Sequence, residues 1–124
     1  MLRQMKSQGH QVIDLEHLAN HRGSAFGDLG LGRRASQQQF ENDLALEIMD
    51  ERIDFDKYVF IESESRRIGD VNIPNEFYSV MAKSTYLILN LSIKQRAKNL
   101  MKDYGDHSQE DYLKRLWNIR KKLG

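Results

Sequence analysis

The stretch "HQVIDLEHLANHRG", residues 10–23, changes from a strand pattern to a helical pattern within a few residues. Val12 and Ile13 are apolar and β-branched and are followed by Asp14, which indicates a short buried strand at about residues 11–14. "LEHLANHRG" then predicts one or two helical turns that end at Gly23. A strand that runs directly into a helix is the repeating unit of a parallel α/β sheet.

Two further segments have the composition of buried strands. "KYVFIES" predicts a strand at about residues 57–62, and its apolar run without alternation indicates burial on both faces. "TYLILNL", residues 85–91, is the clearest strand pattern in the chain. Between them, "ESRRIGDVNI" has the character of a polar excursion without regular structure.

Helical patterns alternate with these strands. Two capping boxes, Ser36 with Gln39 and Ser92 with Gln95, each begin a helix, and Pro74 and Ser108 begin two more. The residues expected on the buried faces are Phe40, Leu44, Ile48 and Met49, then Phe77, Val80 and Met81, then Ile93, Ala97, Leu100 and Met101, and finally Tyr112, Leu113, Leu116 and Trp117. The fold expected is α/β, a three-layer arrangement with a mainly parallel sheet and helices on both faces.

The bulk composition restricts the classes of function. The 124 residues include 19 Lys and Arg against 18 Asp and Glu, so the net charge of +1 does not by itself indicate a nucleic-acid-binding protein. There is no cysteine, which excludes disulfides, thiolate zinc sites and a cysteine nucleophile within this chain. No apolar run approaches the ~20 residues of a membrane span, and the N-terminus is too polar for a signal peptide. We therefore expect a cytoplasmic protein with no membrane contact.

The first residues look like the end of a helix rather than its beginning. Leu2 and Met5 share one face, and Gly9 has the position of a glycine C-cap. Because a domain rarely opens this way, and because three strands make a narrow sheet, we expect residues 1–124 to be one partial domain without its first strand.

Polar side chains are expected together where the strands end, because ligands of open parallel sheets bind outside the carboxyl ends of the strands. Asp14, Glu16 and "NHRGS" follow the first strand, "ESESRR" follows the second, and Asn90 and Arg96 follow the third. "HRGS" offers an arginine fork, an imidazole, a backbone N–H at Gly23 and a hydroxyl, which together suit an oxyanion. The alternative is an ordinary helix end in water.

The acids after the second strand have two possible readings. Glu62 ends the apolar run, and a carboxylate at a strand end holds a metal or orients water in phosphate-transfer proteins. A solvated turn in which Glu64 pairs with Arg66 would give the same sequence.

Two further clusters are less specific. His17 and His21 are four residues apart, but "HLANH" lacks the glutamate of H-E-x-x-H and no third ligand is evident, so no metal site is expected. The C-terminal helix carries Lys114, Arg115, Arg120 and Lys121, which could contact RNA phosphates or form a solvated face.

Four segments together resemble the tRNA 2-selenouridine synthases, in their C-terminal P-loop domain. These segments are "DLEHLANHRGSAFG", "SQQQFENDLA", "IESESRRIG" and "IPNEFYSVM", and their order and spacing agree over roughly residues 10–105. The pairing of HRGS-x-x-G with a later ESR-x-IG is the most specific part of the resemblance.

The resemblance implies a transferase that converts 2-thiouridine at the tRNA wobble position to 2-selenouridine. Selenophosphate would donate selenium, an S-geranylated intermediate would come from geranyl diphosphate, and Mg²⁺ is a possible cofactor. Members usually carry a rhodanese-like domain and a Walker A motif, G-x-x-x-x-G-K-[ST], and neither is present in this sequence. The resemblance therefore implies a P-loop NTPase-like domain truncated at its N-terminus, with little or no activity alone.

The resemblance also assigns roles to particular residues. Its anion- or phosphate-binding residues are His21, Arg22, Gly23, Ser24, Ser65 and Arg66, its catalytic acids are Glu62 and Glu64, and Gly27, Phe40, Glu41, Ile68 and Gly69 match its motifs. Many relatives have Asp at Ser63, so a role that needs a carboxylate there does not carry over. Two alternatives stay open, a non-catalytic nucleotide- or tRNA-binding remnant and a kinase-like P-loop module.

Overall fold

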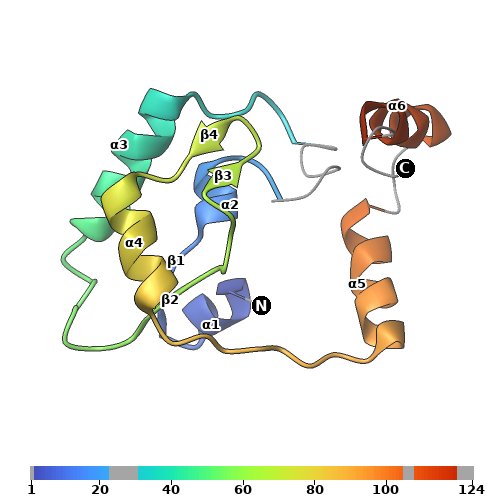
Figure 1. Ribbon diagram of the computed structural model, residues 1–124. Coiled ribbons are helices and arrows are strands. Elements are labelled where there is room, and N and C mark those ends of the chain that lie inside the picture. The colour runs from blue at the N-terminus through green and yellow to red at the C-terminus, as the bar shows by residue number, and fades with distance from the viewer. Residues whose placement is uncertain (1, 23–30, 105–107, 120–124) are drawn as a thin grey trace.

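The computed structural model describes residues 2–22, 31–104 and 108–119. Figure 1 shows its elements in chain order, which are α1 (Leu2–Ser7), β1 (Gln11–Ile13), α2 (Leu15–Leu18), α3 (Gln37–Ile48), β2 (Val59–Ile61), β3 (Arg67–Ile68), β4 (Val71–Asn72), α4 (Asn75–Lys83), α5 (Ile93–Tyr104) and α6 (Gln109–Ile119). None of the helices in these ranges is long and apolar enough to cross a membrane.

The two strands expected at residues 11–14 and 57–62 are confirmed, each slightly shorter than expected. β1 and β2 pair in parallel, with Gln11 opposite Val59 and Ile13 opposite Ile61. The connection between them contains α3, which begins at the expected cap, because the Ser36 side chain accepts a hydrogen bond from the Gln39 N–H. The described part is therefore α/β with a parallel pair, although two strands are too few to form the three layers expected.

Left-handed residues follow the first two helices. Gly9, at φ +88°, ends α1, and the His10 N–H donates to the Met5 carbonyl at 3.1 Å. α2 was expected to end at Gly23, which lies outside the described residues. α2 ends at Leu18, and the left-handed residue Asn20, whose φ is +47°, follows its C-cap Ala19. The His21 N–H donates to the Glu16 carbonyl at 2.9 Å. Among residue types, asparagine adopts this conformation more readily than any other except glycine. Asn20 lies three residues before Gly23, which was expected to follow the helix.

The core lies between α3, β1 and a hairpin that the sequence did not predict. Residues 67–72 form an antiparallel pair, β3 with β4, in place of the polar excursion expected there. The hairpin and the residue after it place Ile68, Val71 and Ile73 against Phe40 and Leu44 of α3, and all five are at most 2% exposed. Each strand of the hairpin has only one buried and one exposed residue. An alternation of apolar and polar residues this short cannot be recognised as a strand pattern in a sequence rich in charges.

α4 begins after Pro74 as expected, and two of its three predicted core residues lie against the core. Phe77 and Met81 are half-buried and pack against the buried cluster. Val80 was expected beside them but is 68% exposed. Met49, which follows α3 and was also expected to be buried, is 78% exposed. A helix that covers only one side of a small core buries a narrow stripe of side chains.

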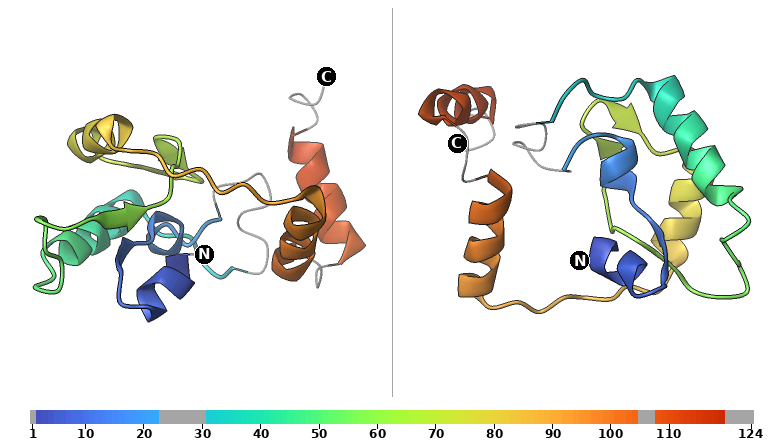
Figure 2. Two further views of the ribbon diagram at one scale, coloured as in Figure 1. Left: turned by 90° about the horizontal axis from the view of Figure 1, so that it is seen from below. Right: turned by 180° about the vertical axis from the view of Figure 1, so that it is seen from behind.

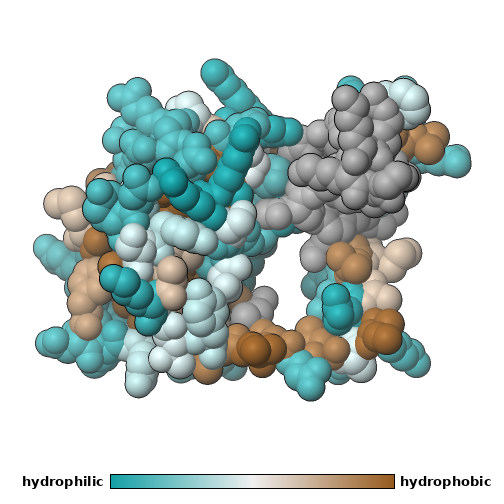
Figure 3. Space-filling view, in the orientation of Figure 1, coloured by the Kyte–Doolittle hydropathy of each residue, from teal (hydrophilic) through white to brown (hydrophobic). Residues whose placement is uncertain are grey.

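The prediction of a third strand at residues 85–91 is wrong. This segment is extended but forms no pairing with the described strands, and its side chains are exposed, from 36% at Leu91 to 91% at Ile88. Figures 1 and 2 show it as a long connection that separates α5 and α6 from the other elements, and Figure 3 shows apolar side chains along it. A strand pattern needs a neighbouring strand to supply hydrogen bonds, and none of the described strands lies beside it.

The faces of α5 and α6 that were expected to be buried are exposed. In α5, Ile93, Leu100 and Met101 are 84%, 57% and 71% exposed, and in α6 Leu113 and Trp117 are 58% and 66% exposed. Both helices begin at their predicted residues: Ser92 exchanges hydrogen bonds with Gln95, and Ser108 accepts one from the Asp111 N–H. Local capping therefore fixes both helices, and no described element packs closely on their apolar sides.

Candidate functional site

Four carboxyl groups gather where β1 and β2 end. Because the two strands are parallel, Asp14 and Glu62 follow them at the same edge of the sheet. The Leu15 N–H donates to Glu62 Oε2 at 2.9 Å, and the Glu62 side chain is hydrogen-bonded to the Asp14 carboxyl. Burial is the main cause that raises the pKa of Glu62, and the bond to Asp14 adds to it. Both effects favour the protonated form of Glu62 over its carboxylate form.

A second pair lies beside the first. Glu16, which is half-buried, is hydrogen-bonded to Glu64. Burial and then the negative charges of Glu64 and Asp14 raise the pKa of Glu16 to about 7, against an opposing effect of Arg22. We call Asp14, Glu16, Glu62 and Glu64 the carboxyl cluster. A group whose pKa lies near 7 can both take up and release a proton at neutral pH.

The carboxyl cluster is not arranged as a metal site. Carboxylate oxygens are the donors that Mg²⁺ prefers, but within residues 2–22, 31–104 and 108–119 no three His, Asp or Glu side chains are placed to hold an ion. His17 is exposed and His21 is buried beyond the end of α2, so the two histidines do not share one helical face. We derive no chemical step through a metal.

His21 joins the two segments of the sequence that were expected to form the site. Its side chain is only 8% exposed, and its ring lies against the backbone of Gly69, which follows β3. A Cβ on Gly69 would come within 2.7 Å of His21 Cδ2 and 2.8 Å of Cγ, and Gly69 has a φ of +59°. Only glycine fits both conditions without a shift of the ring. "HRGS" and "ESRRIG" are therefore in direct contact at His21 and Gly69.

The chain on either side of residues 23–30 is tied to the same region. The Asn20 side-chain amide donates to the Arg33 carbonyl at 2.9 Å. Arg34 forms an ion pair with Asp70, in the turn between β3 and β4. These contacts connect residue 20, residues 33–34 and the hairpin. Arg22 lies near enough to Glu16 for its positive charge to act against the rise in the Glu16 pKa.

The other predicted site residues have different positions. Ser65 is exposed and its hydroxyl donates to the Arg67 carbonyl at 2.8 Å, and Arg66 is exposed. Gly23, Ser24 and Gly27 lie outside the described residues, as do Arg120 and Lys121. Lys114 and Arg115 belong to α6, and the Lys114 side chain is exposed.

Asn90 and Arg96 were expected at the same edge of the sheet, and this expectation is wrong. Asn90 lies in the extended segment and Arg96 in α5, on the side of the molecule away from β1 and β2 (Figures 1 and 2). The edge is therefore built from the ends of two strands, because residues 85–91 do not join the sheet as a third.

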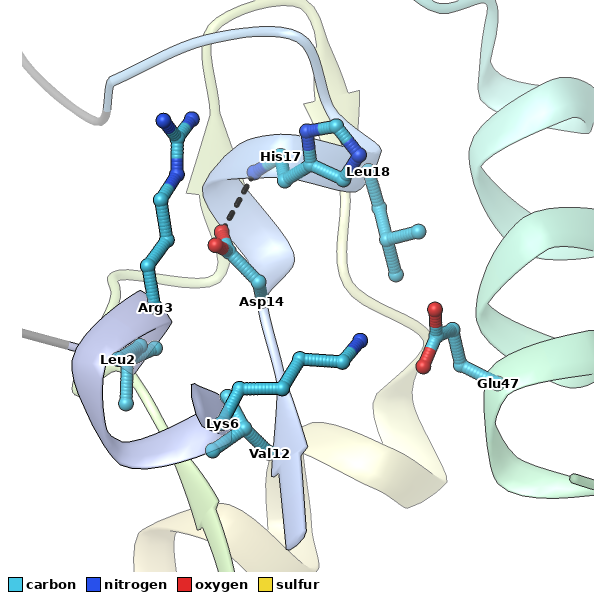
Figure 4. Close-up of a pocket in the computed structure, with 8 residues that line it drawn as sticks. All are labelled: Leu2, Arg3, Lys6, Val12, Asp14, His17, Leu18 and Glu47. Atoms are coloured by element: carbon cyan, nitrogen blue, oxygen red, sulfur yellow. Dashed lines mark hydrogen bonds between the residues drawn. The ribbon is translucent and has the colours of Figure 1, made fainter. Parts of the chain in front are cut away.

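A small hollow lies behind the carboxyl cluster, between α1, β1, α2 and α3 (Figure 4). Its volume is about 220 Å³, and Lys6 extends across it toward Glu47. Asp14 belongs to both the hollow and the cluster, and its carboxylate accepts the His17 N–H at 2.8 Å. This bond orients Asp14 as the N-cap of α2. Asp14 was expected at the strand end but not as a helix cap, although the three-residue spacing of Asp14 and His17 is the signal for that role.

Comparisons with known proteins agree with the resemblance found in the sequence. Residues 1–123 match the family described as the tRNA 2-selenouridine synthase AAA domain. The chain is 36% identical over 106 residues to a protein of Shewanella denitrificans named tRNA 2-selenouridine synthase. The aligned residues are 86% of this chain and 29% of that protein. The proteins of that name from Shewanella frigidimarina and Aeromonas salmonicida are 34% and 36% identical, over 88% and 76% of this chain and 30% and 25% of their own.

The chain thus spans less than a third of the length of these curated relatives. No solved structure matches it. The family match covers nearly every residue, including both of the segments that meet at His21 and Gly69. The chain belongs to the family of the tRNA 2-selenouridine synthase AAA domain.

Proposed function

We propose that this chain is part of a transferase that converts 2-thiouridine at the wobble position of tRNA to 2-selenouridine, in the cytoplasm. Selenophosphate is the proposed selenium donor, and geranyl diphosphate the source of an S-geranylated intermediate. The observation that carries the proposal is the contact of His21 with Gly69, which joins the two motifs of the resemblance. The charge of Arg22 also acts on Glu16 of the carboxyl cluster. Both co-substrates carry phosphate groups, and an arginine near proton-exchanging carboxyls suits such a group.

Each part of the site has a proposed role. Arg22 and Arg66 bind the phosphate oxygens, with His21, Ser65 and the Gly23–Ser24 segment as further donors. Glu62 and Glu64 are the proposed catalytic acids. Support for Glu62 comes from its raised pKa and its bond from the Leu15 N–H, which fixes the carboxyl at the strand end. Support for Glu64 comes from its bond to Glu16, through which a proton can be shared.

Substrate tRNA is proposed to contact the C-terminal helix. Lys114 is exposed there, and Arg115, Arg120 and Lys121 follow in the sequence. Cationic side chains of this kind bind the sugar–phosphate backbone without reading its sequence.

The first experiment tests the anion-binding role on the 124-residue chain itself. Inorganic pyrophosphate is titrated into the wild-type chain and into Arg22→Gln by calorimetry. Loss of a charged hydrogen-bond donor weakens binding by roughly 10- to 100-fold, and Arg52→Gln is the matched control because Arg52 pairs with Asp50 on an exposed turn. Equal affinity of Arg22→Gln and wild type contradicts the role of Arg22.

The second experiment tests the chemistry. This chain replaces the matching segment of the Shewanella denitrificans relative, and the chimera receives geranyl diphosphate, selenophosphate and tRNA that contains 2-thiouridine. Mass spectrometry of the digested nucleosides then measures 2-selenouridine. We expect Glu62→Gln to lower turnover roughly 100-fold, the range of a lost proton-transferring group, with Arg52→Gln unchanged. Turnover by Glu62→Gln at the wild-type rate contradicts the role of Glu62.

A further inference from the structure

Charge is distributed very unevenly along this chain. Residues 1–92 contain ten Lys and Arg against fourteen Asp and Glu, a net charge of −4, whereas residues 93–124 contain nine against four, a net charge of +5. The overall charge of +1 conceals this division. Such an asymmetry between two parts of a chain is typical of a segment that meets a polyanion.

Within the basic part, α5 presents a row of three lysines. Lys94, Lys98 and Lys102 are four residues apart and so lie along one side of the helix, with about 6 Å between successive positions. All three side chains are exposed, and none forms an ion pair with a side chain that the structure describes. We call these three residues the lysine row.

The lysine row is positioned to meet a large partner. α5 follows the extended segment of residues 84–92 and stands with α6 apart from the other elements, as Figures 1 and 2 show from different directions. Its apolar residues Ile93 and Leu100 lie on a different side of the helix from the row. The cations are therefore accessible as a line rather than scattered around the helix.

We propose that the lysine row binds the sugar–phosphate backbone of RNA. A linear set of exposed ammonium groups fits a strand of regularly spaced phosphates and reads no base. The inference rests on the proposed function, in which the substrate is tRNA, and it adds α5 to the interface proposed for α6. RNA is favoured over an anionic membrane because the relatives of this chain are named as tRNA-modifying enzymes.

The test measures binding without turnover. The 124-residue chain is titrated onto a fluorescein-labelled tRNA transcript between 50 and 200 mM salt, and anisotropy gives the dissociation constant. The variant changes Lys94, Lys98 and Lys102 to Gln, which preserves helix propensity, and circular dichroism checks that the helix content is kept. Three phosphate contacts predict that wild type loses about 20- to 40-fold more affinity than the variant over this salt range.

A matched control removes the same charge elsewhere. Lys6, Lys57 and Lys83 are changed to Gln together, and this variant is expected to keep the wild-type salt dependence. Equal loss in both triple variants overturns the inference, because net charge alone would then explain binding. Wild-type affinity in the lysine-row variant, or no binding of tRNA by the wild-type chain, also overturns it.

Two further outcomes separate this inference from its alternatives. Phosphatidylserine vesicles are tested in the same way, and a lysine row needed for vesicles but not for tRNA overturns the RNA assignment. If the chimera described above selenates tRNA while the lysine-row variant binds tRNA as wild type does, the proposed function stands and this inference fails. If the lysine row is needed for tRNA binding but Glu62→Gln selenates normally, the inference stands and the proposed chemistry fails.

Discussion

Substitution of Gly69 by alanine tests the contact that joins the two halves of the candidate site. Two effects add at this position. A φ of +59° costs a residue with a Cβ about 1–2 kcal/mol, and the Cβ would lie 2.7 Å from His21 Cδ2, which forces the buried ring to move at about 1–3 kcal/mol. We expect Gly69→Ala to lower the free energy of unfolding by about 2–5 kcal/mol.

Other glycines of the chain separate the two effects. Gly9 has a φ of +88° but no atom within 4 Å of its Cβ position, so Gly9→Ala should show the backbone term alone. Gly32 has neither a left-handed φ nor a close neighbour, so Gly32→Ala should leave stability nearly unchanged. Urea unfolding followed by far-UV circular dichroism gives each value.

A double-mutant cycle then isolates the histidine. In a His21→Ala background the ring is absent, so Gly69→Ala should cost only the backbone term of about 1–2 kcal/mol. The difference between the two backgrounds is the interaction of His21 with Gly69. If Gly69→Ala destabilises the wild-type chain no more than Gly9→Ala does, the close approach of the ring is not what requires glycine, and the reasoning is refuted.

Three further predictions concern other parts of the molecule. The pKa of Glu16 is raised to about 7 in the folded chain, so protonated Glu16 stabilises the fold, and this contribution is lost as pH rises from about 4.5 to 7. In urea melts over that range, Glu16→Gln should flatten the fall of the unfolding free energy with pH, and an unchanged slope contradicts this. Gln37 exchanges two hydrogen bonds with the Asn72 backbone, at 2.9 and 2.7 Å. Gln37→Ala should therefore lower the free energy of unfolding by about 1 kcal/mol in thermal melts, and an equal loss in the exposed control Gln38→Ala refutes the role of these bonds. Ile88 is 91% exposed, so Ile88→Lys should change the free energy of unfolding by less than about 0.5 kcal/mol in urea melts, and a larger loss contradicts the exposed position of this side chain.

Local signals in the sequence predicted where the helices begin and two of the four strands. The caps at Ser36, Ser92 and Ser108 each begin a helix, since a cap is a bond between residues only three positions apart. The strands at β1 and β2 are short, but each has a β-branched apolar run followed by an acid. What the sequence could not predict was burial, because burial depends on which elements lie opposite. α5 has a clear apolar face, and none of the described elements packs closely on it.

The two motifs of the candidate site were predicted to lie at the same edge of the sheet, but the contact of His21 with Gly69 that joins them was not foreseen. The pairing of Asp14 with Glu62 follows from the parallel register of two strands, which places their ends together. The contact of His21 with Gly69 depends instead on Asn20, which follows the C-cap of α2 and turns the chain toward the hairpin. A left-handed asparagine cannot be told from a helical one by pattern alone, because asparagine occurs in both conformations.

Residues 85–91 show why the strongest local pattern gave the largest error. A run that is apolar on both faces is stable as a strand only when it has covering layers above and below and neighbours that satisfy its backbone groups. β1 and β2 each have one described neighbour, so each also has an outer edge to which a further strand could pair. An unpaired strand edge and an exposed apolar segment both favour association with another strand. Residues 85–91 and the outer edges of β1 and β2 therefore have the same unmet need for a neighbouring strand. The apolar composition of residues 85–91 therefore predicts a strand only if the neighbours it needs are present, and none of the described strands supplies them.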